Sequence, residues 1–254
     1  MEVAIGMSLF HGALYRRGLR KWRKSAHDTP WMTLAGPHRL RAHVVLAALR
    51  ASPRAGDARP EDPAPDHPAL PHGTDWSWRP GLWQAALPVP EMGPIPSQTV
   101  LGGDVTVFHD GAPSEVALRQ TRNADGADGA PYGLLLDVFA FEGAFLSLVL
   151  DLPPAAMDGL TRRHLLRLDT MLELETPLKT FVRLNVKHGP NIERIVRELP
   201  LEASETMIEF DLAYSNVNEK RLDRAWVDLI FEAPKMTRAA LHDVVLSRRL
   251  RAEL

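Results

Sequence analysis

The chain has 254 residues, of which 45% are apolar and 24% are charged, the balance of an ordinary globular protein. It contains no cysteine, which excludes disulfides, thiolate metal sites and a cysteine nucleophile. The net charge of −2 is unevenly distributed, because residues 1–60 hold eleven Lys or Arg against three Asp or Glu. The remaining nineteen basic and twenty-nine acidic residues make 61–254 an acidic body, for which we expect no nucleic-acid partner.

A basic helical arm is predicted over residues 1–51, with one helix around 8–24 and a second around 40–50. Tyr15, Leu19 and Trp22 share one face of the first helix, and cations cover the rest. Such a helix suits an anionic membrane surface. The alternatives are docking on the acidic body of the same chain and binding of another acidic partner. The residues expected to make this contact are Arg16, Arg17, Arg20, Lys21, Trp22, Arg23 and Lys24.

The order of charge and apolar residues at the start of the chain does not match an export signal. The apolar stretch 3–14 precedes the basic cluster, whereas an export signal carries its positive charge first. A dozen residues are also too few to span a bilayer, which takes about 20. We therefore expect a cytoplasmic protein, with peripheral contact to the inner membrane through residues 8–24 as the alternative.

A proline-rich linker is predicted over residues 52–71, because proline lacks a backbone donor and favours an extended chain. A different run follows at 72–83, where three of the six tryptophans fall within eight residues. Trp76 and Trp78 alternate, so both lie on one side of an extended segment. Together with Arg79 they are candidate ligand contacts, since indole faces stack on sugars and cations. The alternative is that the tryptophans pin this segment onto the following domain.

The main domain is predicted over residues 72–254, as an all-β antiparallel sandwich of the jelly-roll type. Apolar and polar residues alternate in about nine segments separated by turn residues, which favours strands with one wet face. Nine strands in one domain favour two packed sheets. A short helical stretch around 192–199 is the one alternative to strand in this region. The predicted strands lie at 105–108, 116–119, 134–141, 145–152, 164–174, 181–187, 207–214, 225–231 and 241–246.

The sequence carries no motif for a metal ion, a phosphate loop or a serine nucleophile, so no cofactor is expected. The most polar strand end holds His188 and Asn191, which are expected in a loop after a strand, and Asn216 lies in a second polar loop. These three are candidate ligand contacts. His188 with Glu193 or Glu198 is a candidate general base, although turn chemistry accounts equally for Gly189-Pro190-Asn191.

Paired carboxylates on the polar faces of strands are a further candidate. Glu173 with Glu175, and Glu209 with Asp211, lie side by side if each pair is on a strand. The spacing permits an acid/base pair, but a solvated strand face explains it as well.

The motifs at 72–80, 106–110, 184–191 and 209–215 together resemble an uncharacterised alphaproteobacterial family, a domain of unknown function. The resemblance covers most of 72–254 and implies no substrate or catalytic residue. The last two predicted strands, at 226–232 and 241–246, are similar to those of jelly-roll carbohydrate-binding modules, which implies glycan binding through exposed aromatic residues and polar loops.

These observations predict a non-catalytic binding module, with a glycan or a protein as its partner, tethered by the basic helix. One alternative is a structural or assembly subunit that binds a protein partner. The other is an enzyme on a β-sandwich that uses His188 with a nearby carboxylate.

Overall fold

The computed structural model describes residues 70–112, 114–123, 129–201 and 203–252. The basic arm and most of the linker lie outside these residues, so the helices and the membrane contact expected there stay predictions. In the part of the chain that the structure describes, no helix is long and apolar enough to cross a bilayer.

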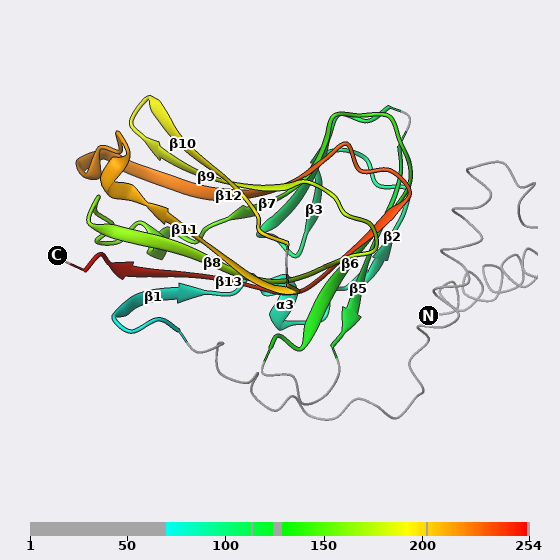
Figure 1. Cartoon of the computed structure of the whole chain (residues 1–254), viewed down its shortest axis with the longest axis horizontal. Coiled ribbons are helices and arrows are strands. Elements are labelled where there is room, and N and C mark those ends of the chain that lie inside the picture. Colours follow the sequence, from blue (N-terminus) through cyan, green and yellow to red (C-terminus); the bar gives the residue numbers. More distant parts are fainter. Residues whose placement is uncertain (1–69, 113, 124–128, 202, 253–254) are drawn as a thin grey trace, which may run out of the picture.

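Two antiparallel sheets packed face to face make up the domain, which confirms the predicted sandwich (Figure 1). The seven-stranded sheet has the order β11–β8–β13–β6–β5–β2, and β1 also pairs with β13. Its strands are β1 (Thr74–Trp78), β2 (Glu91–Met92), β5 (Ser114–Arg122), β6 (Tyr132–Phe141), β8 (His164–Leu174), β11 (Glu205–Asp211) and β13 (Thr237–Leu250).

The six-stranded sheet has the order β10–β9–β12–β7–β4–β3 and forms the upper layer of Figure 1. The chain passes repeatedly from one sheet to the other, as when β8 leads into β9 and β10 into β11. The strands of this sheet are β3 (Thr99–Leu101), β4 (Val105–His109), β7 (Phe145–Asp151), β9 (Thr180–His188), β10 (Asn191–Glu198) and β12 (Leu222–Glu232).

The core lies between the sheets and follows from the period-two alternation of the strands. Along β9, Val182, Leu184 and Val186 are buried, and along β12 the same holds for Val227, Leu229 and Phe231. Because successive side chains point to opposite faces, the residues between them lie on the outer face of the sheet. The helical elements are short: α3 (Gly81–Gln84), η2 (Pro154–Ala156), η3 (Leu212–Tyr214) and η4 (Glu219–Arg221).

The structure differs from the predicted elements in several places. The stretch at 192–199, which was open to a helical reading, belongs to strand β10 at the edge of its sheet. The strand expected over 207–214 ends at Asp211, and η3 follows with Tyr214 81% exposed. The strands β2 and β3, of two and three residues, were not predicted, because they are too short to show alternation.

Candidate functional site

The tryptophan-rich run forms a docking segment, residues 74–84, that consists of β1 and α3. β1 pairs with the second half of β13, from Trp78 opposite Leu246 to Thr74 opposite Arg249. β6 pairs with the first half of the same strand. Trp76 and Trp78 are partly buried and pack against the core. This is the arrangement that the pinning alternative predicted, and it leaves a ligand platform on these two indoles without structural support.

Arg79 is buried as well, with 3% of its side chain exposed. Its Nε donates to Asp243 Oδ1 at 2.9 Å and its Nη2 donates to Oδ2 at 2.8 Å. Asp243 follows an irregularity in the pairing of β13 with β8, and such bulges re-aim side chains. Arg79 and Asp243 therefore hold the docking segment against β13. Because its guanidinium is buried in this pair, Arg79 is not placed to contact a ligand.

Trp83 and Gln120 fix the other end of the docking segment. Trp83 is fully buried and its Nε1 donates to the carbonyl of Leu241 at 3.2 Å. The Gln120 amide donates to the carbonyls of Leu82 and Ala85, and its oxygen accepts from the backbone of Leu87. The segment is thus part of the domain, whose start lies upstream of the first predicted strand.

The other predicted ligand residues lie near the β9–β10 hairpin. His188 is the last residue of β9, Asn191 is the first of β10, and the two are directly paired, so they are not in a loop. His188 is buried with 6% exposed, whereas Asn191 and Asn216 are exposed. Asn216 donates its backbone N–H to Glu193. Among the described residues no hydrogen bond or ion pair joins His188 to a carboxylate, so the geometry gives the general-base alternative no support.

Of the four paired carboxylates, Glu175 follows the end of β8, and the other three have partners of their own. Glu209 accepts from Arg249 Nη2 at 2.9 Å, and Asp211 accepts from the backbone of Ala213. Glu173 lies 3.5 Å from His242 Nε2. Within the described ranges no group of three or more His, Asp or Glu side chains could hold a metal ion.

The outer face of the six-stranded sheet gathers aromatic, cationic and amide side chains that come from β9 and β12. Register places Asp228 opposite Arg183, Trp226 opposite Asn185 and Ile230 opposite Phe181. We call this set the binding face, and it comprises Phe181, Arg183, Asn185, Lys187, Arg224, Trp226, Asp228 and Ile230.

A hydrogen-bonded polar cluster occupies the centre of the binding face. Asp228 Oδ2 accepts from Arg183 Nε at 2.6 Å and from Asn185 Nδ2 at 2.9 Å. Asn185 and Asp228 are 1% and 2% exposed although they lie on the outer side of the sheet. The Arg183 side chain remains 40% exposed. The buried carboxylate therefore holds the guanidinium in a fixed orientation at the surface.

Trp226 is the aromatic residue beside this cluster. It is half-buried, and the Arg224 guanidinium lies 4.8 Å from its ring centroid, within the range of a cation–π contact. Phe181 is also half-buried, at the other end of the same face. Arg224, Trp226 and Arg183 thus set guanidinium donors beside aromatic carbon on one sheet surface.

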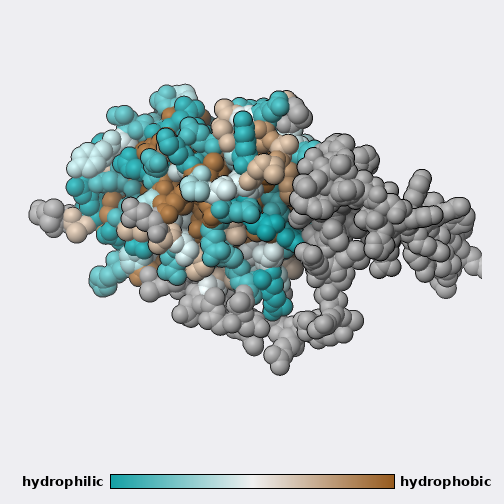
Figure 2. Space-filling model, turned by 45° about the vertical axis from the view of Figure 1, so that its right-hand side comes forward, coloured by the Kyte–Doolittle hydropathy of each residue, from teal (hydrophilic) through white to brown (hydrophobic). Residues whose placement is uncertain are grey.

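Hydrophobic side chains also reach the surface at residues outside the binding face. Figure 2 shows hydrophobic residues gathered over the middle of the face it presents, among hydrophilic ones. Ile192 and Val196 of the edge strand β10 are 37% and 48% exposed, on the outer side of the six-stranded sheet. The apolar surface on this side therefore extends from the binding face toward the edge of the sheet.

Comparisons with solved structures find distant similarities. The enzymatically active domain of bacteriophage CBA120 tailspike protein 4 is 10% identical, with a TM-score of 0.39, and covers 56% of this chain. The chain spans 19% of the length of that tailspike chain. A family 11 carbohydrate-binding module from Clostridium thermocellum, solved with a β-1,3-1,4-mixed-linked tetrasaccharide, is 12% identical over 66% of this chain and all of its own, with a TM-score of 0.38.

A third similar structure is the CBM22-1 xylan-binding domain of Paenibacillus barcinonensis Xyn10C. It is 9% identical over 72% of this chain and all of its own length, with a TM-score of 0.36. A comparison with curated protein sequences finds no match. The sequence model of one protein family matches residues 3–254, and the chain belongs to this family, which is described as a family of unknown function (DUF6478).

Proposed function

We propose that the protein is a non-catalytic glycan-binding module whose ligand lies on the binding face, against Trp226. The observation that carries the proposal is the position of a half-buried indole beside a preorganised polar cluster on an open sheet surface.

The chemistry of a sugar ring matches this face. A sugar ring presents C–H groups on its faces and hydroxyl groups around its edge, so it needs an apolar surface with polar groups beside it. Trp226 and Phe181 supply the apolar surface. Arg183 and Arg224 supply N–H donors that can bond to hydroxyl groups, and the buried Asn185 helps to hold the carboxylate that orients Arg183.

The polar cluster lowers the cost of binding, because it is ordered before the ligand arrives. Asp228 receives hydrogen bonds from both Arg183 and Asn185, so these side chains lose little rotamer freedom on binding. No serine, threonine or cysteine is among the residues that define the binding face, and His188 is directed away from it, on the inner side of β9. These features favour retention of a ligand over its conversion.

A glycan array probed with the full chain tests the proposal, followed by titration calorimetry with the glycans that bind. Trp226→Ala is expected to weaken binding at least about ten-fold, because it removes the central aromatic contact. Tyr214→Ala is the matched control, since it removes an exposed aromatic side chain from η3, outside the binding face.

The control is expected to bind as tightly as the wild-type chain. The proposal fails if the wild-type chain binds no glycan on the array. It also fails if Trp226→Ala, with an unchanged circular dichroism spectrum, binds as tightly as the wild-type chain.

A further inference from the structure

A pocket of about 1020 Å³ opens at the side of the sandwich, near the Phe181 end of the binding face. It lies where the chain crosses between the two sheets, between the β8–β9 connection and the β10–β11 connection. None of the side chains that define the binding face lines it. Its volume is at the upper end of the range for small-molecule sites, about 300–1,000 Å³.

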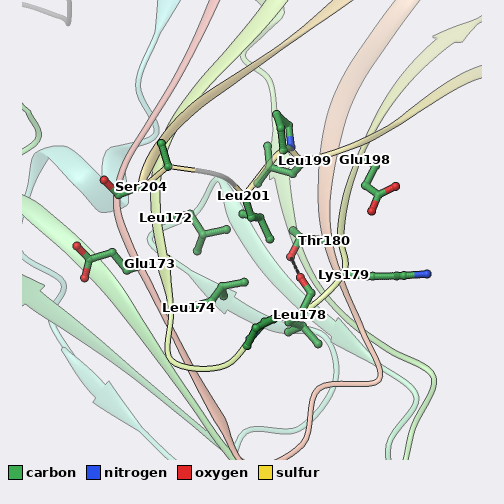
Figure 3. A pocket seen from close by; sticks show the side chains of 13 residues that line it. Leu172, Glu173, Leu174, Leu178, Lys179, Thr180, Glu198, Leu199, Leu201 and Ser204 are labelled. Atoms are coloured by element: carbon green, nitrogen blue, oxygen red, sulfur yellow. Dashed lines mark hydrogen bonds between the residues drawn. The ribbon is translucent and has the colours of Figure 1, made fainter.

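Leucine dominates the lining of this pocket (Figure 3). Leu172 and Leu199 are buried core residues, and Leu174, Leu178 and Leu201 are partly buried against the core. No aromatic residue is among the lining residues. The interior is therefore an extension of the aliphatic core that opens to the surface.

Hydrogen bonds across the opening make the pocket a feature of the fold. The backbone of Leu172 donates to the Ser204 carbonyl at 2.9 Å, and that of Leu199 donates to the Thr180 carbonyl at 2.8 Å. Thr206 Oγ1 donates to the Pro200 carbonyl at 2.7 Å. The β10–β11 connection is thus tied to β8, β9 and β11. The β8–β9 connection is tied to β12, because the backbone of Glu232 donates to the Lys179 carbonyl at 3.0 Å.

Polar groups in the pocket are either satisfied or at its rim. The hydroxyl of Thr180, a fully buried residue, donates to the Leu178 carbonyl at 3.2 Å. Glu173, Lys179 and Glu198 are exposed, and in Figure 3 the Lys179 side chain extends away from the leucines. A ligand rich in hydroxyl groups would leave them without partners against the leucines, which is costly. An alkyl chain meets no such cost.

We propose that this pocket binds the aliphatic chain of a free amphiphile with an uncharged head group. The tail lies among the leucines and the head group remains in the solvent at the mouth. The described residues of the rim carry charges of both signs, with two carboxylates against one ammonium, which gives no attraction for an anionic head group. The site does not depend on the glycan-binding function.

Titration calorimetry of the full chain with unbranched 1-alkanols from hexanol to decanol tests the proposal. Burial of one more methylene is worth about four-fold in affinity. We therefore expect the affinity to rise by about this factor for each added carbon, as long as the tail still lies within the pocket.

Two variants locate the binding. Ala203→Trp places an indole at the rim from an exposed position, and Leu201→Gln puts an amide on the wall. Ala155→Trp is the matched control, because it adds an indole at another exposed alanine, in η2. Circular dichroism establishes that each variant is folded.

Ala203→Trp and Leu201→Gln are each expected to weaken 1-decanol binding at least about ten-fold, and Ala155→Trp is expected to leave it unchanged. The proposal is overturned if no alkanol binds, or if affinity does not depend on chain length. It is also overturned if folded Ala203→Trp and Leu201→Gln bind 1-decanol as the wild-type chain does.

Discussion

Two buried charges hold the docking segment in place. Arg79 and Asp243 are almost inaccessible to water, and each is the other's bidentate partner across 164 residues of chain. Asp243 Oδ1 also accepts from the backbone of Val244 at 2.8 Å. Removal of one partner would leave the other charged and unpaired in a site that solvent cannot reach.

Arg79→Ala is expected to lower the free energy of unfolding by about 3–5 kcal/mol, measured by urea denaturation. Lys187→Ala is the control, because its ion pair with Asp223 is exposed at both ends, with 38% of the Lys187 side chain and 52% of the Asp223 side chain accessible. An exposed pair of this kind contributes about 0–1 kcal/mol. Equal losses in the two variants would contradict the role assigned to Arg79.

Asp75 links β1 to β8 and β13 through two partners. Its Oδ1 accepts from Arg248 Nε at 2.9 Å. The backbone of Thr161 donates to His164 Nδ1, so His164 Nε2 carries the proton and donates to Asp75 Oδ2 at 3.1 Å. Burial raises the pKa of Asp75, but the hydrogen bond and charge of Arg248, together with His164, lower this pKa below its ordinary value of 3.8.

A lowered carboxylate pKa adds stability above the ordinary pKa, and this stability is lost as the pH falls toward the folded-state value. The urea midpoint of the wild-type chain should therefore fall below about pH 4. Asp75→Asn should be less stable at pH 7 and show a smaller decrease in that acidic range. Glu142→Gln, at an exposed position, is the control. Parallel pH profiles of the wild-type chain and Asp75→Asn would refute the assignment.

At the scale of elements, strands with one buried face could be predicted and strands without one could not. β8 shows its inner face in the sequence, because His164, Leu166 and Leu168 alternate with polar or partly exposed residues. β10 is at a sheet edge and is largely exposed on both faces, so it has no alternation. Its apolar residues also fall at helical spacing, which is why the stretch at 192–199 was open to a helical interpretation.

The β9–β10 hairpin depends on one backbone conformation. Gly189 has φ of 58°, in the left-handed region, and Pro190 follows it in a two-residue turn between His188 and Asn191. This pattern fits a type II′ turn, which requires glycine first. The turn fixes the register that sets Arg194 opposite Asn185 on the binding face.

Gly189→Ala is expected to destabilise the chain by about 1–2 kcal/mol, because an L side chain is strained at this φ. An added Cβ would meet only Arg221, at 3.7 Å, so the cost would come from the backbone and not from a clash. Thermal unfolding measures it. Gly81→Ala, at a glycine whose φ is not positive, is the comparison, and an equal loss in both variants would exclude backbone strain as the cause.

The candidate site was only partly accessible to prediction. The polar positions Arg183, Asn185 and Lys187 are visible in the sequence as the outer side of a strand. The burial of Asn185 and Asp228 could not be predicted, and neither could the hydrogen bond between them. Both depend on the pairing of strands that are more than 40 residues apart in the chain. Trp226 and Asp228 are two residues apart, so the sequence places them on the same side of a strand. The tryptophan-rich run at 76–83 predicts ligand contacts, but its tryptophans pack on the core.

At the scale of the whole molecule, the two proposed ligand surfaces use different parts of the sandwich. The binding face is the outer surface of one sheet, and the leucine-lined pocket opens between the sheets at their sides. The docking segment contributes no residue to either surface. Its strand β1 pairs with β13 and so belongs to the seven-stranded sheet. A sandwich can thus separate stabilisation, polar recognition and apolar binding, because its faces and its open sides are physically distinct.

The central position of β13 has a consequence for the order of events in folding. β13 lies between β8 on one side and β6 with β1 on the other, yet it is the last of the described strands in chain order. Without β13 the seven-stranded sheet is three separate parts, β11 with β8, β6 with β5 and β2, and β1 alone, each with an unpaired edge. Trp76 and Trp78 then have no neighbouring strand. Such edges and aromatic surfaces invite pairing between chains, so the growing chain is more prone to aggregation before β13 is made than after it.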